Sequence, residues 1–165
     1  MGEERETMKA AAEIRGEGIE GRAEFTEIEK GTQTYVKVRV TLKSDPGRLS
    51  PGKHACHIHE KAVCEAPFKS AGGHFDPGPA SNTDPDVNHP YHMGDLPNLV
   101  VDHGGKGEME GFSTRITLSD GPLSILSGGG TAMIIHEKED PYRGGESGSG
   151  VSGGGRVACG VIRKA

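Results

Sequence analysis

The sequence predicts an all-β domain, a sandwich or barrel whose short strands are joined by long loops. Its 165 residues include 27 glycines and 10 prolines, a content that favours turns and loops over a helical bundle. Several short stretches alternate apolar and polar side chains, and none shows a convincing helical period. The length suits one domain, which we expect at residues 9–165 after a disordered acidic leader at residues 1–8.

The clearest predicted strand runs from Tyr35 to Leu42, where valine and leucine alternate with Tyr, Lys, Arg and Thr. A period of two is typical of a strand with one buried face. A turn signal follows at Ser44–Gly47. The other expected strands lie in the ranges 23–28, 55–60, 99–102, 109–118, 131–137 and 157–162. Many short strands with turns between them favour a sandwich or barrel.

Two long segments lack any such pattern. Residues 61–96 are rich in Gly, Pro, Asn and Asp, and residues 141–155 are rich in Gly and Ser. Loops of this length inside a compact domain usually carry function or need a covalent link. We therefore expect the functional residues to gather on these two loops.

Charge and hydropathy exclude two classes of partner. The formal net charge is -5 and no dense cluster of Lys and Arg is present, which argues against nucleic-acid binding. The longest apolar stretches, such as Ala132–Ile135, are too short to span a bilayer, so no membrane span is expected. Residues 1–9 are charged and polar and contain no apolar signal-peptide segment.

The eight histidines are clustered rather than scattered. His57 and His59 are two residues apart in a predicted strand, so both imidazoles point to the same side. His74 follows in the long loop, and His136 ends a predicted strand. Imidazoles without thiolates suit copper(II), which prefers nitrogen ligands. The alternative for the whole set is a group of solvated loop histidines.

A second group combines histidine with a carboxylate. His92 and Asp95 are three residues apart with a glycine between them, so a tight loop can turn both onto one ion. His89 is a third candidate in the same segment. Histidine and aspartate together favour zinc, which accepts nitrogen and oxygen ligands tetrahedrally.

Five motifs, in this order along the chain, resemble those of the copper/zinc superoxide dismutase family. They are Gly52–Glu60, Ala71–Phe75, His92–Leu96, His136–Lys138 and Gly155–Ile162. The resemblance covers roughly residues 10 to 162 and implies an eight-stranded Greek-key β-barrel. It implies an antioxidant enzyme, an oxidoreductase that converts superoxide to oxygen and hydrogen peroxide by cycling between Cu(II) and Cu(I).

The resemblance also implies roles for individual residues. The implied copper ligands are His57, His59, His74 and His136. His74 would bridge copper and zinc and carry a proton, and His92 and Asp95 would bind zinc. Asp140 matches a carboxylate that links the two metal sites, and Arg156 matches an arginine that guides the superoxide anion to copper.

One departure from the family concerns the remaining zinc histidine. It normally lies midway between the positions matched by His74 and His92, where this chain has Asn82, Thr83 and Asp84. We expect His89 to replace it. The alternatives are Asp84 or Asp86 as the ligand, a water molecule, or a zinc site that stays empty.

The resemblance implies a disulfide between Cys64 and Cys159, which leaves Cys56 as a small core residue. Because disulfides favour oxidising compartments, we expect a mature periplasmic or secreted protein, with the cytoplasm as the alternative. A homodimer is left open. The competing functions are a copper-binding module of the same fold without efficient turnover and, with less support, a zinc hydrolase.

Overall fold

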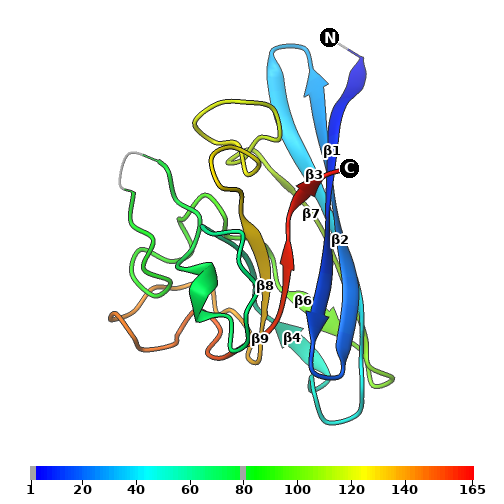
Figure 1. Cartoon of the computed structure of the whole chain (residues 1–165), viewed down its shortest axis with the longest axis vertical. Helices are drawn as coiled ribbons and strands as arrows, with labels where there is room; N and C mark the ends of the chain where they lie inside the picture. The colour runs from blue at the N-terminus through cyan, green and yellow to red at the C-terminus, as the bar shows by residue number, and fades with distance from the viewer. Residues whose placement is uncertain (1–2, 79–80) are drawn as a thin grey trace.

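The computed structural model describes residues 3–78 and 81–165, and in these residues ten strands form one antiparallel sheet (Figure 1). The strands are β1 (Glu4–Gly16), β2 (Ile19–Lys30), β3 (Gln33–Ser44), β4 (Gly52–His54), β5 (Cys56–His59), β6 (Leu99–Val101), β7 (Lys106–Ser113), β8 (Ala132–His136), β9 (Arg156–Val161) and β10 (Arg163–Lys164). The described residues contain one short 3-10 helix, Lys69–Ala71. No helix in this part of the chain is long and apolar enough to cross a membrane.

The sheet closes into a barrel because one stretch of chain holds both of its ends. The strand order is β4-β6-β7-β3-β2-β1-β9-β8-β5, and only Ala55 separates β4 from β5. Ile162 separates β9 from β10 in the same way. If each interrupted pair is counted as one strand, the described chain has the eight strands that the family resemblance implies. The all-β barrel is therefore confirmed.

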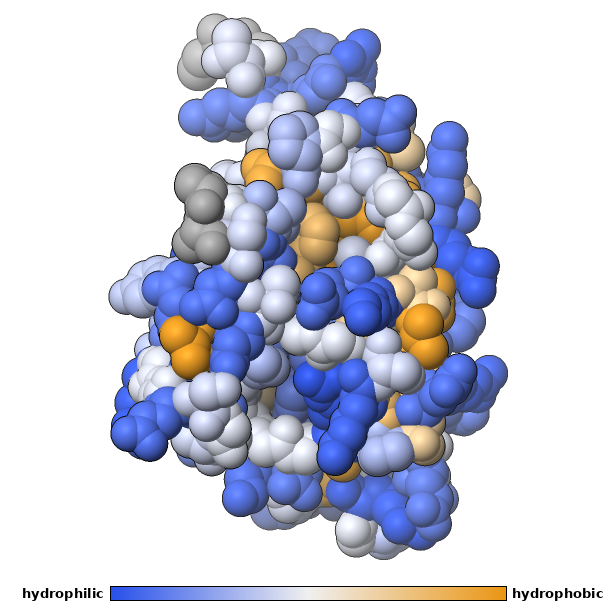
Figure 2. Space-filling view, turned by 60° about the vertical axis from the view of Figure 1, so that its left-hand side comes forward, coloured by the Kyte–Doolittle hydropathy of each residue, from blue (hydrophilic) through white to orange (hydrophobic). Residues whose placement is uncertain are grey.

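The barrel interior is aliphatic, as the alternation in the sequence predicts. Val36, Val38 and Val40 of β3 are buried at 0–1% exposure, while Arg39 between them faces solvent. The register pairs Val38 with Phe25 of β2, which is also buried. Figure 2 shows an outer face that is mostly hydrophilic, with apolar surface confined to small separate areas.

Two expectations about strands are wrong. Residues 4–8 of the expected leader belong to β1 and pair with β2, while residues 1 and 2 lie outside the described residues. Cross-strand ion pairs such as Arg5–Glu29 join charged side chains that looked unstructured in the sequence. The strand expected at residues 109–118 instead runs from Lys106 to Ser113, because Ile116 and Leu118 belong to a loop that folds into the core.

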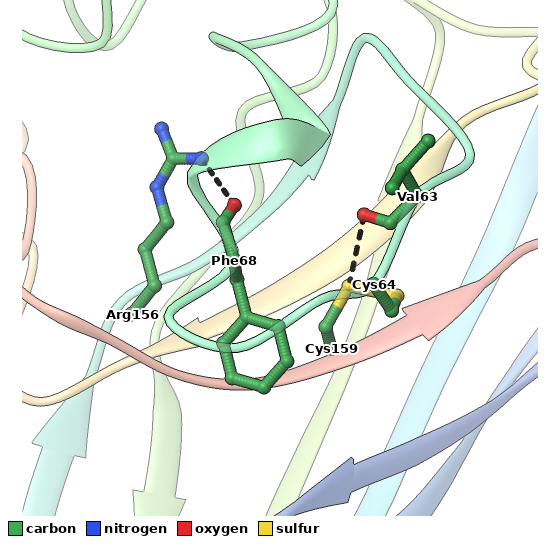
Figure 3. The surroundings of a disulfide bond; sticks show 5 residues. All are labelled: Val63, Cys64, Phe68, Arg156 and Cys159. Atoms are coloured by element: carbon green, nitrogen blue, oxygen red, sulfur yellow. Dashed lines mark hydrogen bonds between the residues drawn. A yellow bond between two sulfur atoms is a disulfide. The ribbon is translucent and has the colours of Figure 1, made fainter.

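Both long loops project from the same side of the barrel, where the green and orange segments of Figure 1 lie. A disulfide joins Cys64 of the first loop to Cys159 of β9 across a sequence separation of 95 (Figure 3). Cys56 is a free, buried thiol whose pKa burial raises to about 12. The disulfide therefore attaches the histidine-bearing loop to the barrel wall.

Removing the disulfide is expected to destabilise the fold and to loosen the first loop. In the chain-entropy model a bridge of this span contributes up to about 4–5 kcal/mol to the free energy of unfolding. The double variant Cys64→Ser/Cys159→Ser should show this loss in urea unfolding. Cys56→Ala keeps the bridge and should lose only the packing of one sulfur atom. Peptide mapping without reductant that found Cys56 in a bridge would contradict the pairing.

Candidate metal centre

Four buried imidazoles meet where the first long loop packs against the barrel wall. His57 and His59 come from β5, His136 ends the neighbouring strand β8, and His74 reaches them from the first long loop. A backbone bridge pairs His59 with His74. One ring nitrogen from each of the four lies within 4.8 Å of the others, and all four residues are at most 2% exposed. The four candidates that the sequence predicts for copper are thus brought together. These four histidines are called the copper-side cluster below.

The ring nitrogens of this group are arranged as metal donors. Nδ1 of His59 lies 3.0 Å from the Gly72 carbonyl oxygen and Nδ1 of His136 lies 3.2 Å from that of Gly154. Each carbonyl accepts a hydrogen bond from the Nδ1–H of its ring, so each Nε2 keeps a lone pair that faces the cluster. Nε2 of His59 and Nε2 of His74 are buried with no hydrogen-bond partner in the described residues. Unpaired buried nitrogens that converge on one point fit a bound ion.

The protonation states agree with metal binding. Burial, together with the neighbouring imidazoles, lowers the pKa of His57 to about 4 and that of His136 to about 3. Burial likewise lowers the pKa of His74 to about 4, against the opposing effect of Asp95. These three imidazoles are therefore uncharged at neutral pH, which is the state in which an imidazole nitrogen can coordinate copper(II).

A second cluster surrounds Asp95. Its Oδ1 lies 2.7 Å from Nδ1 of His74, and its Oδ2 lies 2.8 Å from Nδ1 of His92 and 3.1 Å from Nδ1 of His89. Nδ1 of His74 and Nδ1 of His92 are 3.2 Å apart. His74, His89, His92 and Asp95, called the zinc-side cluster below, offer three imidazole nitrogens and one carboxylate. This donor set suits tetrahedral zinc. Asp84, one of the alternatives, is bonded elsewhere through its carboxylate, to Ser147.

Without metal, the zinc-side cluster is held together by ion pairs. Burial alone would lower the pKa of His89, but hydrogen bonds to Asp140 and Asp95 outweigh it and raise the pKa to about 9. The same three imidazoles hold the pKa of Asp95 far below its usual range despite its burial. His89 is therefore protonated at neutral pH in the absence of metal. Zinc must displace that proton, because only a neutral imidazole nitrogen can coordinate.

Asp140 connects the two clusters. Its Oδ2 lies 2.9 Å from Nε2 of His57, and both of its oxygens lie 2.7 Å from Nε2 of His89. Asn98 fixes the backbone of this aspartate from both sides: its Nδ2 donates to the Asp140 carbonyl, and its Oδ1 accepts the Asp140 N–H. Residue spacing does not predict this role of Asn98, because an amide that bonds to backbone groups follows no spacing rule.

Comparison with known proteins identifies the family. The family model of copper/zinc superoxide dismutase matches residues 19–162. The chain belongs to the copper/zinc superoxide dismutase family. A copper/zinc superoxide dismutase of Aquifex aeolicus is 37% identical over 94% of this chain and 87% of its own length. One from Deinococcus radiodurans is 34% identical over 88% of this chain and 78% of its own length.

A solved structure leads to the same fold. The crystal structure of the clock protein EA4 superposes with a TM-score of 0.73 at 33% sequence identity, covering 94% of this chain and 93% of that one. Family membership and the named relatives support superoxide dismutase activity, an oxidoreductase function with copper and zinc as its metals. A module of the same fold without turnover is not favoured.

In this dismutase Arg156 stands beside the copper-side histidines. Its Nη1 donates a 2.8 Å hydrogen bond to the Phe68 carbonyl oxygen, next to the disulfide (Figure 3). The side chain is half-buried at the start of β9. After burial and the neighbouring imidazoles, its positive charge is a further cause of the low pKa of His59. The guanidinium therefore adds positive charge at the four imidazoles.

Proposed function

We propose that superoxide is dismutated at a copper ion held by the copper-side cluster, beside a zinc ion held by the zinc-side cluster. The proposed copper ligands are His57, His59, His74 and His136, and the proposed zinc ligands are His74, His89, His92 and Asp95. One observation carries this proposal. His74 presents an unpaired Nε2 on one side and an Nδ1 directed at Asp95 on the other, so a single ring can serve both ions.

The chain's own residues account for binding, orientation and proton supply. When bound, copper supplies the one-electron chemistry by which one superoxide becomes oxygen and a second, with two protons, becomes hydrogen peroxide. Asp140 fixes the tautomer and orientation of His57, because its carboxylate accepts a hydrogen bond from Nε2–H and leaves Nδ1 unprotonated. Nε2 of His74 is the atom proposed to hold a proton for the peroxide product. Arg156 attracts and orients the anion.

Metal analysis combined with an EPR spectrum and a superoxide-removal assay tests the proposal. We expect copper and zinc in each chain, a Cu(II) signal with nitrogen coupling, and rapid turnover. A copper signal without turnover would instead indicate the binding module, and zinc without copper would indicate the hydrolase.

Reversing the charge of Arg156 should weaken the attraction of superoxide. For Arg156→Glu we expect activity at low salt to fall roughly tenfold, within the range of electrostatic steering effects. The dependence of activity on ionic strength should flatten or invert, because salt screens attraction and repulsion alike. Arg39→Glu, an exposed residue of β3, changes the net charge equally and is the control. Equal losses in both variants would assign the effect to net charge and not to guidance.

We further propose that the protein works outside the cytoplasm. The Cys64–Cys159 disulfide supports this, because such bonds persist in oxidising compartments. Subcellular fractionation of the native host that recovered the protein with its cytoplasm would contradict the proposal.

A further inference from the structure

Asp86 connects the first long loop (residues 61–96) to the glycine-rich loop that follows β8. It lies between His74 and His89 in the chain and is 5% exposed. Its Oδ2 accepts the Gly150 N–H at 3.0 Å, and its Oδ1 accepts both the N–H and the hydroxyl of Ser152 at 3.2 Å. This one carboxylate therefore satisfies three donors of another loop.

The turn that Asp86 holds is packed directly against a proposed copper ligand. The N–H groups of Gly153 and Gly154 bond back to the Gly150 carbonyl, which closes the turn. Gly153 has a φ of 146°, and a Cβ built on it would lie 2.9 Å from Cβ of His136. The next carbonyl, that of Gly154, lies 3.2 Å from Nδ1 of His136. A displacement of this turn would therefore move the partner that orients the His136 ring.

We propose that Asp86 is a positioning residue of the copper site. Because Asp86 holds the turn at residues 150–154, the orientation of His136 depends on the first long loop. The same bonds hold the chain that leads to Arg156. This connection is separate from Asp140, whose carboxylate contacts His57, His89 and the Tyr142 N–H but no group of the turn. The inference rests on the proposed copper ligands.

The variant Asp86→Asn is the sharpest test, because it keeps the volume and replaces one acceptor oxygen with a donor. Either the Gly150 N–H or the Ser152 N–H then faces an NH₂ group and loses its partner. Loss of one such bond is expected to raise amide exchange across residues 150–154 about tenfold. In the holoenzyme the Cu(II) EPR signal should shift and broaden, and azide should bind more weakly. Copper and zinc contents should stay at wild-type levels.

Asp102→Asn is the matched control. The Oδ1 of Asp102 likewise accepts two backbone N–H groups, those of Gly104 and Lys106, but in the turn between β6 and β7. This variant should change local exchange there and leave the EPR signal and the azide affinity unaltered. A structural role of Asp86 without positioning would give the same pattern as this control.

The inference is overturned if Asp86→Asn keeps the wild-type EPR signal and azide affinity. If that variant does not fold, Ser152→Ala removes one of the three bonds and should shift the EPR signal in the same direction by a smaller amount; an unchanged signal again overturns the inference. The outcome is distinct from failure of the proposed copper ligands. That failure would appear as a wild-type protein without a nitrogen-coupled Cu(II) signal.

Discussion

Replacing His59 with alanine is expected to abolish superoxide dismutation while the barrel stays folded. Nε2 of this residue is buried without a hydrogen-bond partner in the described chain, and its other nitrogen is already bonded to Gly72. Loss of the imidazole removes one of four proposed copper donors. Since changes in residues that merely support metal ligands cost about 10–100-fold, loss of a ligand should lower activity by at least about 100-fold.

The barrel should survive this change because β5 is held through its backbone. His59 pairs with Ala132 of β8 in the strand register, and that pairing does not use the side chain. Circular dichroism should stay unchanged while the EPR signal loses the coupling of one nitrogen. His103→Ala, in an exposed turn, is the control and should keep full activity. Full activity in His59→Ala would exclude His59 as a ligand.

The sequence predicts those strands in which large apolar residues alternate with polar ones. It predicts less well the strands that are built from alanine or from charged residues. Strand β3 follows from buried valines that alternate with polar residues. Strand β1 buries Ala10, Ala12 and Ile14 on one face, but alanine is a weak apolar signal and the N-terminal part of the strand is charged. Its pairing with β2 depends on long-range register, which single-sequence periodicity does not report.

The candidate site shows a similar division. The identities of the histidines and of Asp95 point to metals, and the family motifs assign most of them in advance. The place of His89 depends on the path of a loop, since its ring is held between Asp95 and Asp140, two carboxylates far apart in the sequence. Asn98 and Asp86 act on backbone groups, which no residue spacing reveals.

Replacing His89 with alanine should remove zinc and leave copper largely in place. Nδ1 of His89 points at Asp95 in the zinc-side cluster, whereas the copper-side cluster does not include this residue. Zinc affinity should fall at least about 100-fold, more than the loss of a supporting residue causes. Asp84→Asn is the control, because Asp84 is one of the alternative ligand candidates and its carboxylate is bonded to Ser147; this variant should leave zinc bound. Unchanged zinc content in His89→Ala would exclude His89 as a ligand.

The same variant should also destabilise the metal-free protein, with a defined pH dependence. Without His89, Asp95 and Asp140 each lose a buried cationic partner, and breaking such a pair costs about 3–5 kcal/mol. Because the folded pKa of about 9 lies above the ordinary value of 6.5, this stabilisation is complete below pH 6.5. It disappears as the pH rises through 9. Urea unfolding of metal-free wild type and His89→Ala should therefore differ most in mildly acidic buffer and least at alkaline pH. A difference that grew with pH would contradict the ion-paired state of His89.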